Sequence, residues 1–404
     1  MRATKDSGVE WLGDIPADWD VRPCWSSFRR VKQTGFPEEE LLSVYRDHGV
    51  VPKSSRDDNH NVESEDLTSY QLVRVGDMVM NKMKAWQGSI ALSDHRGIVS
   101  PAYFVYRPTQ EFSRKYFHYL LRSAPYVAHY NRISKGVRVG QWDLDPTYFR
   151  TTSLIVPPVR EQRRIADFLD RETAKIDALI AKQEQLISTL DERRKSIIVR
   201  YVSRGINPES VLVRTGNHQV STIPNHWSLK RLRHFAQIES GAEYKDLEIF
   251  EDGFPVYGSG GAFAQVSRYM YNGESVLFGR KGTIDKPLYV NGPFWTVDTM
   301  YWTRFTQPVN VKFVYYWATT VPFGLFTTST ALPSMKSSDI KNFFIAMPPL
   351  AEQGQIVRHL DAEVDAIDSL IKKSSDFLKT LGERRQALIS AAVTGKLEVS
   401  DGYS

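Results

Sequence analysis

Two long stretches of the chain place apolar residues at helical spacing. From residue 160 to about 204, apolar side chains recur at intervals of three, four or seven, the period of one face of an α-helix. The positions are Ile165, Leu169, Ile176, Leu179, Leu186, Leu190 and Ile197, widened by Ile180 and Ile187. A second stretch repeats the pattern at Ile356, Leu360, Ile367, Leu370, Leu378, Leu381 and Leu388. We predict two helices of about 40 residues, each roughly 60 Å long.

Each predicted helix follows the same motif. Pro157-Pro158-Val159-Arg160-Glu161-Gln162 opens the first helix, and Pro348-Pro349-Leu350-Ala351-Glu352-Gln353 opens the second. A proline pair can precede a helix but not lie inside one, and Gly205 and Gly395 supply stop signals. Roughly half of positions 157–194 are identical in 348–385, which indicates an internal duplication. The matching stripes predict that the two helices form an antiparallel coiled coil.

A second repeated motif marks the start of each copy. Ile15-Pro16-Ala17-Asp18-Trp19 opens the first copy, and Ile223-Pro224-Asn225-His226-Trp227 opens the second. The predicted organisation is an N-terminal segment 1–14, a domain 15–156, a helix 157–204, a linker 205–222, a domain 223–347, a helix 348–395 and a tail 396–404. The second copy has no close match to residues 7–13 before its Ile-Pro. We therefore expect the repeat to be imperfect there.

Both predicted domains are rich in strand signals. Short β-branched and aromatic runs, such as residues 72–75, 78–80 and 102–106 in the first and 275–278 and 299–302 in the second, are separated by glycine-bearing turns. Equivalent segments beginning at Lys115 and Lys312 predict a short helix that packs its aromatic residues on a sheet. The fold class is α+β, with two similar strand-rich domains, two long helices and a pseudo-twofold internal repeat.

Composition narrows the possible environments and partners. The formal net charge of +5 is mild support for a nucleic-acid partner. No apolar stretch is long enough to span a bilayer and no signal peptide is apparent, so a cytoplasmic protein is expected. Cys24 is the single cysteine, which excludes disulfides within the chain and predicts a buried, inert thiol.

Motifs for catalysis and cofactor binding are absent from the sequence. The prolyl pairs lack the Asn/Asp-Pro-Pro-Tyr pattern of adenine methyltransferases, and no phosphate-binding loop or dinucleotide fingerprint is present. The nine histidines are scattered without metal-ligand spacing. Asp77 and Glu274 each follow a glycine, as turn or strand-entry residues do. We expect no catalytic residue, no metal and no cofactor.

Basic and polar loops are the candidate contacts to DNA. Lys82 and Lys84 with Trp86, and Arg280 with Lys281, occupy corresponding loops that follow a strand. Residues 136–141 have the composition of a mobile loop, in which Arg138 and Gln141 carry side chains able to make bidentate base contacts. For each of these residues an exposed charge on an ordinary turn is an equally good interpretation, and Trp86 and Tyr257 suit turn or core packing better than base stacking.

The two repeated motifs, the long helices, Val256-Tyr257-Gly258-Ser259-Gly260-Gly261 and Gly279-Arg280-Lys281-Gly282 together resemble the specificity subunit of type I restriction-modification systems. The resemblance covers nearly the whole chain. It implies two target recognition domains that each read half of a split, asymmetric site on double-stranded DNA. It also implies helices that set the gap and dock two adenine-specific methyltransferase subunits, which restriction and translocation subunits join.

Two other functions remain open from the sequence. The first is a stand-alone, two-headed DNA-binding protein with no methyltransferase partner, which the absence of a neighbouring methyltransferase gene would favour. The second is a methyltransferase with an unrecognised motif, which binding of S-adenosylmethionine by the chain alone would favour. The DNA target itself depends on loop geometry and DNA shape, so the sequence does not give it.

Overall fold

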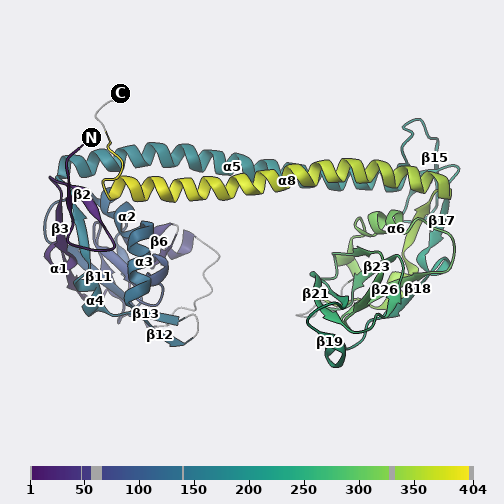
Figure 1. The fold of residues 1–404 in the computed structure, drawn as a ribbon, viewed down its shortest axis with the longest axis horizontal. Helices are drawn as coiled ribbons and strands as arrows, with labels where there is room; N and C mark the ends of the chain where they lie inside the picture. Colours follow the sequence, from purple (N-terminus) through teal and green to yellow (C-terminus); the bar gives the residue numbers. More distant parts are fainter. Residues whose placement is uncertain (1, 47, 56–65, 139–140, 327–332, 400–404) are drawn as a thin grey trace. The chain divides into compact units, whose positions relative to one another are not determined.

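The computed structural model describes residues 2–46, 48–55, 66–138, 141–326 and 333–399. Its residues form two compact units, the first comprising Met1–Gln183 with Asp376–Ser404 and the second Glu184–Ser375. Both predicted long helices are confirmed as α5 (Val159–Arg204) and α8 (Leu350–Val393), labelled in Figure 1. Each unit therefore contains one part of each long helix and one strand-rich domain.

The first unit is built on a four-stranded antiparallel sheet with the order β4-β11-β8-β9. These strands are β4 (Phe28–Val31), β11 (Tyr103–Pro108), β8 (Met78–Asn81) and β9 (Ile90–Leu92). Five two-stranded pairs surround it: β1 (Thr4–Asp6) with β2 (Asp14–Pro16), β3 (Asp20–Pro23) with β14 (Ser153–Val156), β5 (Leu42–Tyr45) with β6 (Gly49–Pro52), β7 (Gln71–Val73) with β10 (Gly97–Val99), and β12 (Ser134–Arg138) with β13 (Gln141–Leu144). Its shorter helices are α1 (Cys24–Ser27), α2 (Arg114–Arg122), α3 (Ala124–Ile133), α4 (Pro146–Arg150), η1 (Lys53–Ser55) and η2 (Ala85–Gln87).

The second unit repeats this plan. Its four-stranded sheet has the order β18-β26-β23-β24, from β18 (Ala236–Ser240), β26 (Met300–Phe305), β23 (Ser275–Gly279) and β24 (Leu288–Val290). The pairs β15 (Leu212–Arg214) with β16 (Thr222–Pro224) and β17 (Ser228–Arg231) with β27 (Phe344–Met347) recur. A five-stranded sheet is added, in the order β19 (Glu248–Ile249), β21 (Gly261–Val266), β20 (Phe254–Gly258), β25 (Pro293–Thr296), β22 (Tyr271–Asn272). The helices are α6 (Val311–Ala318), α7 (Ser337–Asn342), η3 (Leu232–His234), η4 (Lys245–Leu247) and η5 (Phe323–Phe326).

The repeat extends further toward the N-terminus of each copy than the sequence indicates. Strand β15 pairs with β16 in the register in which β1 pairs with β2, so that Leu212 faces Pro224 as Thr4 faces Pro16. The expected imperfection before the second Ile-Pro is therefore one of sequence and not of backbone pairing. Backbone hydrogen bonds define this ribbon, and exposed strands such as β1 and β15 tolerate different side chains.

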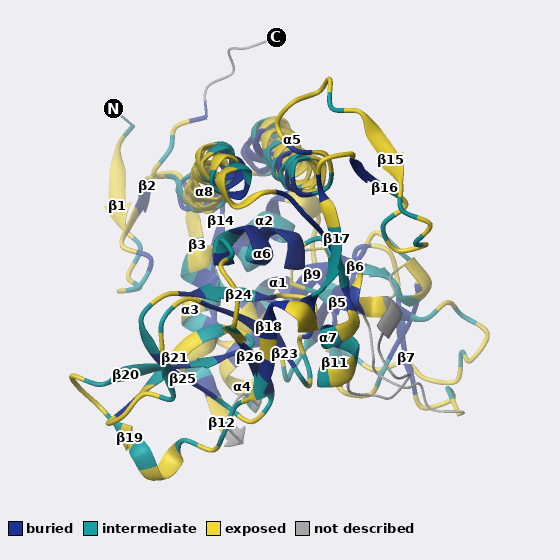
Figure 2. Cartoon of the chain, turned by 90° about the vertical axis from the view of Figure 1, so that its right-hand side faces the viewer, coloured by how far each residue is buried: buried dark blue, intermediate teal, exposed yellow. Residues whose placement is uncertain are grey.

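The short aromatic helices predicted at Lys115 and Lys312 are confirmed as α2 and α6. Tyr116 and Phe117 of α2, and Phe313 and Trp317 of α6, are buried. Figure 2 shows α6 mostly in the colour of buried residues. In each unit this helix belongs to the hydrophobic core that also receives apolar residues of α5 and α8. Burial of such large side chains is the main source of stability for each domain.

Hydrogen bonds between the two repeated motifs explain why both occur in each copy. The indole Nε1 of Trp19 donates to Glu161 Oε2 over 2.9 Å in the first unit, and Trp227 Nε1 donates to Glu352 Oε2 over 3.2 Å in the second. Burial raises the pKa of the Glu161 carboxyl, but hydrogen bonds from Arg2 and Trp19 outweigh it, so the net pKa is lowered. Glu161 and Glu352, at the start of the two long helices, thus hold the tryptophan of the Ile-Pro-x-x-Trp motif in the same unit.

The glutamines of the same motif bind the N-cap residues of the aromatic helices. Gln162 Oε1 accepts the backbone N–H of Ser113 over 2.9 Å, and Gln353 Oε1 accepts that of Asn310 over 2.9 Å. Ser113 and Asn310 are the N-cap residues of α2 and α6. An N-cap side chain satisfies an otherwise unpaired N–H of the first helical turn. The Pro-Pro-x-x-Glu-Gln motif therefore joins each long helix to two parts of its domain.

A second junction is repeated with the same side chains. Asp170 on α5 accepts from Lys115 Nζ over 2.5 Å and from the Tyr119 hydroxyl over 2.8 Å. Asp361 on α8 accepts from the Tyr316 hydroxyl over 2.5 Å and lies 2.8 Å from the ammonium of Lys312. Burial is the main cause that raises the pKa of Tyr119 to about 12, so its hydroxyl remains a donor at neutral pH. The aromatic helix of each domain is thus tied to one long helix at two successive turns.

The long helices pack antiparallel within each unit. Arg385 pairs with Asp177 at 2.8 Å in the first unit, and Arg194 pairs with Asp368 at 3.1 Å in the second. Less exposed positions on both helices follow the alternating spacing of three and four that is typical of a coiled coil. On α5 they are Leu169, Thr173, Ile176, Ile180, Gln183, Ile187, Leu190 and Arg194, and on α8 they are Leu360, Val364, Ile367, Ile371, Ser374, Leu378, Leu381 and Arg385.

Part of the predicted apolar stripe lies outside this contact. The side chains of Leu179, Leu186 and Leu370 are 45, 42 and 49% exposed, although the sequence placed them in the stripe. Ile180, Ile187 and Ile371, one position further along, are less exposed. A single partner helix covers only a narrow seam, so a broad apolar stripe leaves one edge exposed.

We expect Gly395→Ala to destabilise the first unit. Gly395 follows α8 at φ +74°, and a Cβ there would lie 2.3 Å from Pro16 Cδ and 3.1 Å from the ring of Trp19. Overlap with the proline ring adds to the backbone strain, for a total of roughly 3 kcal/mol. Gly13→Ala is the matched control, since Gly13 has φ +65° but open space at its Cβ position. Thermal unfolding of the full chain should show a clearly larger loss for Gly395→Ala, and equal losses would contradict the packing described.

Candidate nucleic-acid interface

The first candidate loop follows β8 and carries Lys82, Lys84 and Trp86. Its backbone is fixed to the β12–β13 hairpin by a hydrogen bond of 3.1 Å from Leu144 N–H to the Lys82 carbonyl. The Trp86 indole donates to the Met83 carbonyl over 3.1 Å and packs against Trp142 with ring centroids 5.9 Å apart. Trp86 therefore stabilises the loop.

The charges of this loop differ in their surroundings. Lys82 Nζ lies 3.6 Å from Asp143 Oδ2, and each side chain is about one-third exposed (34 and 35%). Lys84 is exposed. The structure brings Lys82, Lys84 and Trp86 together on one loop, as the sequence predicts. Whether they contact DNA stays a prediction.

Arg138 and Gln141 belong to the adjoining hairpin. They are Cα partners in the pairing of β12 with β13, with an irregularity between Gly136 and Arg138. The expectation of a mobile loop over 136–141 is therefore wrong for the paired residues, because the backbone bonds of a hairpin replace the loop. Residues 139 and 140 and the side chains of Arg138 and Gln141 lie outside the described part of the structure, so their proposed base contacts stay a prediction.

The second candidate loop follows β23 and carries Arg280 and Lys281. The carbonyl of Arg280 accepts the N–H of Met335 over 3.0 Å, and the N–H of Gly282 donates to the Pro333 carbonyl over 2.9 Å. A Cβ at Gly279 would lie 2.2 Å from the Thr283 carbonyl oxygen, so this turn requires glycine. Such a turn lets backbone approach a ligand closely.

The side chains of this loop have different partners. The Arg280 guanidinium donates to the Asp298 carbonyl over 3.2 Å and lies 5.8 Å from the ring centre of Tyr301, whereas Lys281 is exposed. The structure therefore leaves the Lys281 ammonium accessible and holds Arg280 against the domain. Contact of Arg280 and Lys281 with DNA stays a prediction.

Backbone pairing makes the two loops equivalent. Leu144 bonds to Lys82 in the first unit, and Met335 bonds to Arg280 in the second. Leu144 precedes β14 by the same interval by which Met335 precedes β27. In each domain, one backbone hydrogen bond thus holds the loop after β8 or β23 against the segment that leads to α5 or α8. We call this hydrogen bond the clamp. The side chains on the two loops are different, as the sequence indicates.

Sequence reasoning missed Trp142 and Asp143. Trp142 packs on Trp86, and Asp143 is the ionic partner of Lys82. The signal that points to them is the repeat itself, because Leu144 and Met335 stand at matching positions before the two Pro-Pro motifs. Contacts between segments this far apart in the chain do not follow from local pattern.

Cys24, Asp77 and Glu274 have structural roles in the two domains. Cys24 is buried, as predicted, and burial raises the pKa of its thiol to about 12, which disfavours the reactive thiolate. Asp77 accepts from Arg107 at 3.0 Å and from the backbone of Arg74 at 2.9 Å, and Glu274 accepts from the Tyr289 hydroxyl. Within the described ranges no cluster of three His, Cys, Asp or Glu residues has the arrangement to hold a metal ion.

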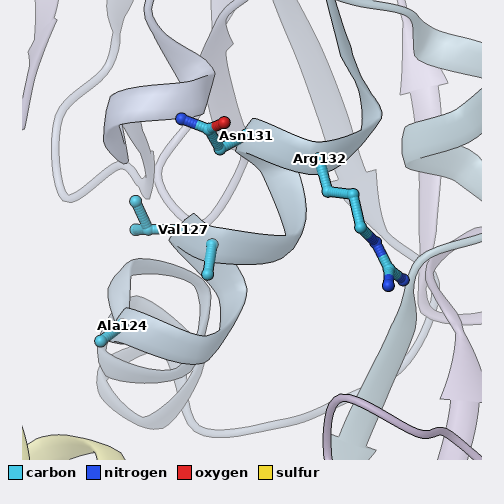
Figure 3. A pocket seen from close by; sticks show the side chains of 5 residues that line it. Ala124, Val127, Asn131 and Arg132 are labelled. Atoms are coloured by element: carbon cyan, nitrogen blue, oxygen red, sulfur yellow. The ribbon is translucent and has the colours of Figure 1, made fainter.

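The first unit also contains an open hollow of about 620 Å³ on one face of α3 (Figure 3). Its lining is Ala124, Val127, Ala128, Asn131 and Arg132. The side chains in Figure 3 come from a single helix and include no carboxylate, thiol or histidine. This hollow has no pair of groups for acid–base or nucleophilic chemistry.

Comparison with known proteins explains the duplication. Residues 37–189 and 224–379 each match the family model of the type I restriction modification DNA specificity domain, and together they cover more than half of the chain. The chain belongs to this family. Both candidate loops lie inside the matched segments of this DNA specificity family, as do most of α5 and α8.

Similar specificity subunits match nearly the whole chain. The specificity subunit of the type I restriction enzyme EcoKI from Escherichia coli K12 is 19% identical over 433 residues, covering 95% of this chain and 90% of the relative. That of StySPI from Salmonella potsdam is 20% identical over 432 residues, with coverage of 95% and 90%. A solved structure on complex assembly and conformational transition of the type I R-M system contains a similar chain, with a TM-score of 0.73 and 16% sequence identity. The match covers 95% of this chain and 99% of that chain. At this identity the structural likeness establishes the fold.

No helix among the described residues is both long enough and apolar enough to cross a membrane. The long helices α5 and α8 instead carry charged side chains on their outer faces, including Lys175 and Lys379.

Proposed function

We propose that this chain is the non-catalytic specificity subunit of a cytoplasmic type I restriction-modification enzyme and reads a split, asymmetric site on double-stranded DNA. Each strand-rich domain reads one half of the site. The observation that supports the proposal is the repeated clamp, the hydrogen bond from Leu144 to Lys82 and from Met335 to Arg280. It holds two loops with different side chains at equivalent positions of the two domains. One frame with two sets of loop side chains suits the recognition of two different sequences.

The side chains of the loops have different roles in DNA binding, according to their chemistry. The ammonium groups of Lys82, Lys84 and Lys281 suit phosphate oxygens, which position the domain without reading sequence. Arg138 and Gln141 on the hairpin suit the edges of guanine and adenine. Arg280 suits either role, and Trp86 acts through the shape of its loop.

The long helices fix the gap between the half-sites and dock two adenine-specific methyltransferase subunits, which restriction and translocase subunits then join. The exposed edge of the stripe supports docking, because Leu179, Leu186 and Leu370 present apolar surface that the partner helix does not cover. Apolar side chains in such positions are typical of surfaces that bind another protein. No metal or cofactor is assigned to this chain.

Methyl transfer by reconstituted complexes tests the proposal. The purified chain alone should transfer no tritiated methyl group from S-adenosylmethionine to DNA, because its sequence lacks the methyltransferase motifs. The chain combined with its methyltransferase should methylate adenine at one specific site. Transfer by the highly purified chain alone would identify it as a methyltransferase, which contradicts the proposal.

The same assay separates the stand-alone alternative. If the methyltransferase encoded nearest to the gene transfers methyl groups equally well with and without the chain, the chain acts without that partner. The methyltransferase alone is therefore the matched control, and a random duplex of equal length controls for sequence-independent methylation.

A further inference from the structure

Two arginines of the second unit converge on one neutral oxygen. Arg231, at the end of β17, donates to Asn342 Oδ1 over 3.4 Å, and Arg233, in η3, donates to the same atom over 3.1 Å. The amide nitrogen of Asn342 donates to the Ser338 carbonyl over 2.8 Å, which fixes the orientation of the oxygen. We call Arg231 and Arg233 the arginine pair.

The arginine pair has no counter-charge. Among the described residues, neither guanidinium is hydrogen-bonded or ion-paired to a carboxylate. Arg231 also lies over the Phe344 ring at 4.7 Å, which holds its position without neutralising it. Other arginines of the fold pair with carboxylates, such as Arg107 with Asp77 and Arg385 with Asp177.

The surroundings of the arginine pair are also basic. Lys336 and Lys341 lie at the beginning and end of α7, the helix that also carries Asn342. Asp339 is the acidic residue on α7, and its carboxylate accepts from Ser338. Glu239 on the adjacent strand β18 is paired with Arg304 at 3.5 Å. Positive charge therefore exceeds negative charge on η3 and α7, which carry the arginine pair's neighbours and its acceptor, and an anion with several oxygens would relieve the repulsion.

This surface continues from the second candidate loop. Met335, whose N–H bonds to the Arg280 carbonyl, is followed directly by Lys336 and then by α7. A helix of six residues is roughly 9 Å long, and phosphates on one DNA strand follow at about 3.4 Å along the axis, so the surface spans about three phosphates.

The first unit lacks the arginine pair. Pro23 of β3 faces Ser153 as Arg231 of β17 faces Phe344, so Pro23 is the counterpart of Arg231. By the same register Trp25 and Thr151 stand in place of Arg233 and Asn342. The basic surface is therefore a property of the second domain and not of the repeated frame.

We propose that Arg231, Arg233, Lys336 and Lys341 form a contact to the phosphate backbone of DNA, made by the second domain beside its half-site. This inference rests on the proposed function. The contact adds affinity without reading bases, and it makes binding by the second domain more dependent on salt than binding by the first.

The test measures the affinity of the full methyltransferase complex for a target duplex at several salt concentrations. Replacing both arginines (Arg231→Gln with Arg233→Gln) should weaken binding at least tenfold and reduce the slope of log affinity against log salt by about two. Binding to random duplex should weaken by the same factor, and the methylated motif should not change. Arg304→Gln is the matched control, since Arg304 already pairs with Glu239, and it should have a much smaller effect.

Several outcomes separate the explanations. An unchanged slope and affinity in the folded double variant would overturn the inference, while specific binding by the wild type would leave the proposed function standing. Absence of specific binding by the wild-type complex would instead refute the proposed function. If the double variant does not fold, Lys336→Gln with Lys341→Gln gives the same test with side chains that do not bond to Asn342. Inorganic phosphate that binds the wild type while the DNA slope is unchanged would identify a free anion and overturn a DNA contact.

Discussion

Exchanging residues 15–156 for the matching domain of a related specificity subunit should change one half of the methylated target and leave the other half unaltered. The reason is that each domain has its own sheet, with the orders β4-β11-β8-β9 and β18-β26-β23-β24, and its own clamped loop. We expect complete replacement of that half of the target sequence, because each half is read by one domain alone. Sequencing of methylated bases in a strain that carries the chimera measures it.

The design of the exchange follows from the junction contacts. The donor domain needs a tryptophan at the position of Trp19, because the recipient helix supplies Glu161 as its acceptor. It also needs a lysine and a tyrosine at the positions of Lys115 and Tyr119 for Asp170. The reciprocal exchange of 223–347 is the control and should change the other half. Alteration of both halves by either exchange would refute independent reading.

Insertion of four residues after Ser188 should lengthen the preferred gap by one or two base pairs. Ser188 is an exposed residue of α5, and four residues add on the order of 6 Å of helix, against about 3.4 Å per base pair. Four residues are also close to one turn, so the positions after the insertion, beginning with Leu190, are displaced by about one turn relative to Ile187 and the positions before it. Both half-site sequences should be retained.

The matched control inserts the same four residues after His218, an exposed residue between β15 and β16. This change lengthens the chain without lengthening a helix and should leave the gap unchanged. Methylation of a set of duplexes with gaps of graded length measures both variants. An active, folded Ser188 variant that keeps the original gap would show that the helices do not set it.

The sequence predicts the long helices well because local signals define them. The proline pairs lie just before Val159 and Leu350, and glycines follow Arg204 and Val393 closely. The seam is less predictable. Leu179 and Ile180 are adjacent apolar residues, and only the position of the partner helix decides which of them is covered.

The site is predictable in part for a related reason. Lys82 and Arg280 follow strands whose β-branched and aromatic residues are visible in the sequence, so their loops can be located. The residues that fix these loops, Leu144 and Met335, come from segments far along the chain and bond through the backbone. Backbone hydrogen bonds leave no side-chain pattern, and the repeat is the one signal that relates the two segments.

The arginine pair could not be predicted from the sequence. Arg231 and Arg233 are two of many basic residues in the sequence, and their spacing carries no motif. Their distinction is the shared acceptor Asn342 without a carboxylate, which only the fold establishes.

Mapping of methylated adenines in the host genome, with and without this gene, tests the central claim most directly. The account predicts that one motif with two specific parts and a gap of fixed length is methylated in the wild type and unmethylated in the deletion strain. Restoring the gene should restore the same motif. Persistence of every methylated motif in the deletion strain would contradict the assignment of this chain as the subunit that selects the DNA site.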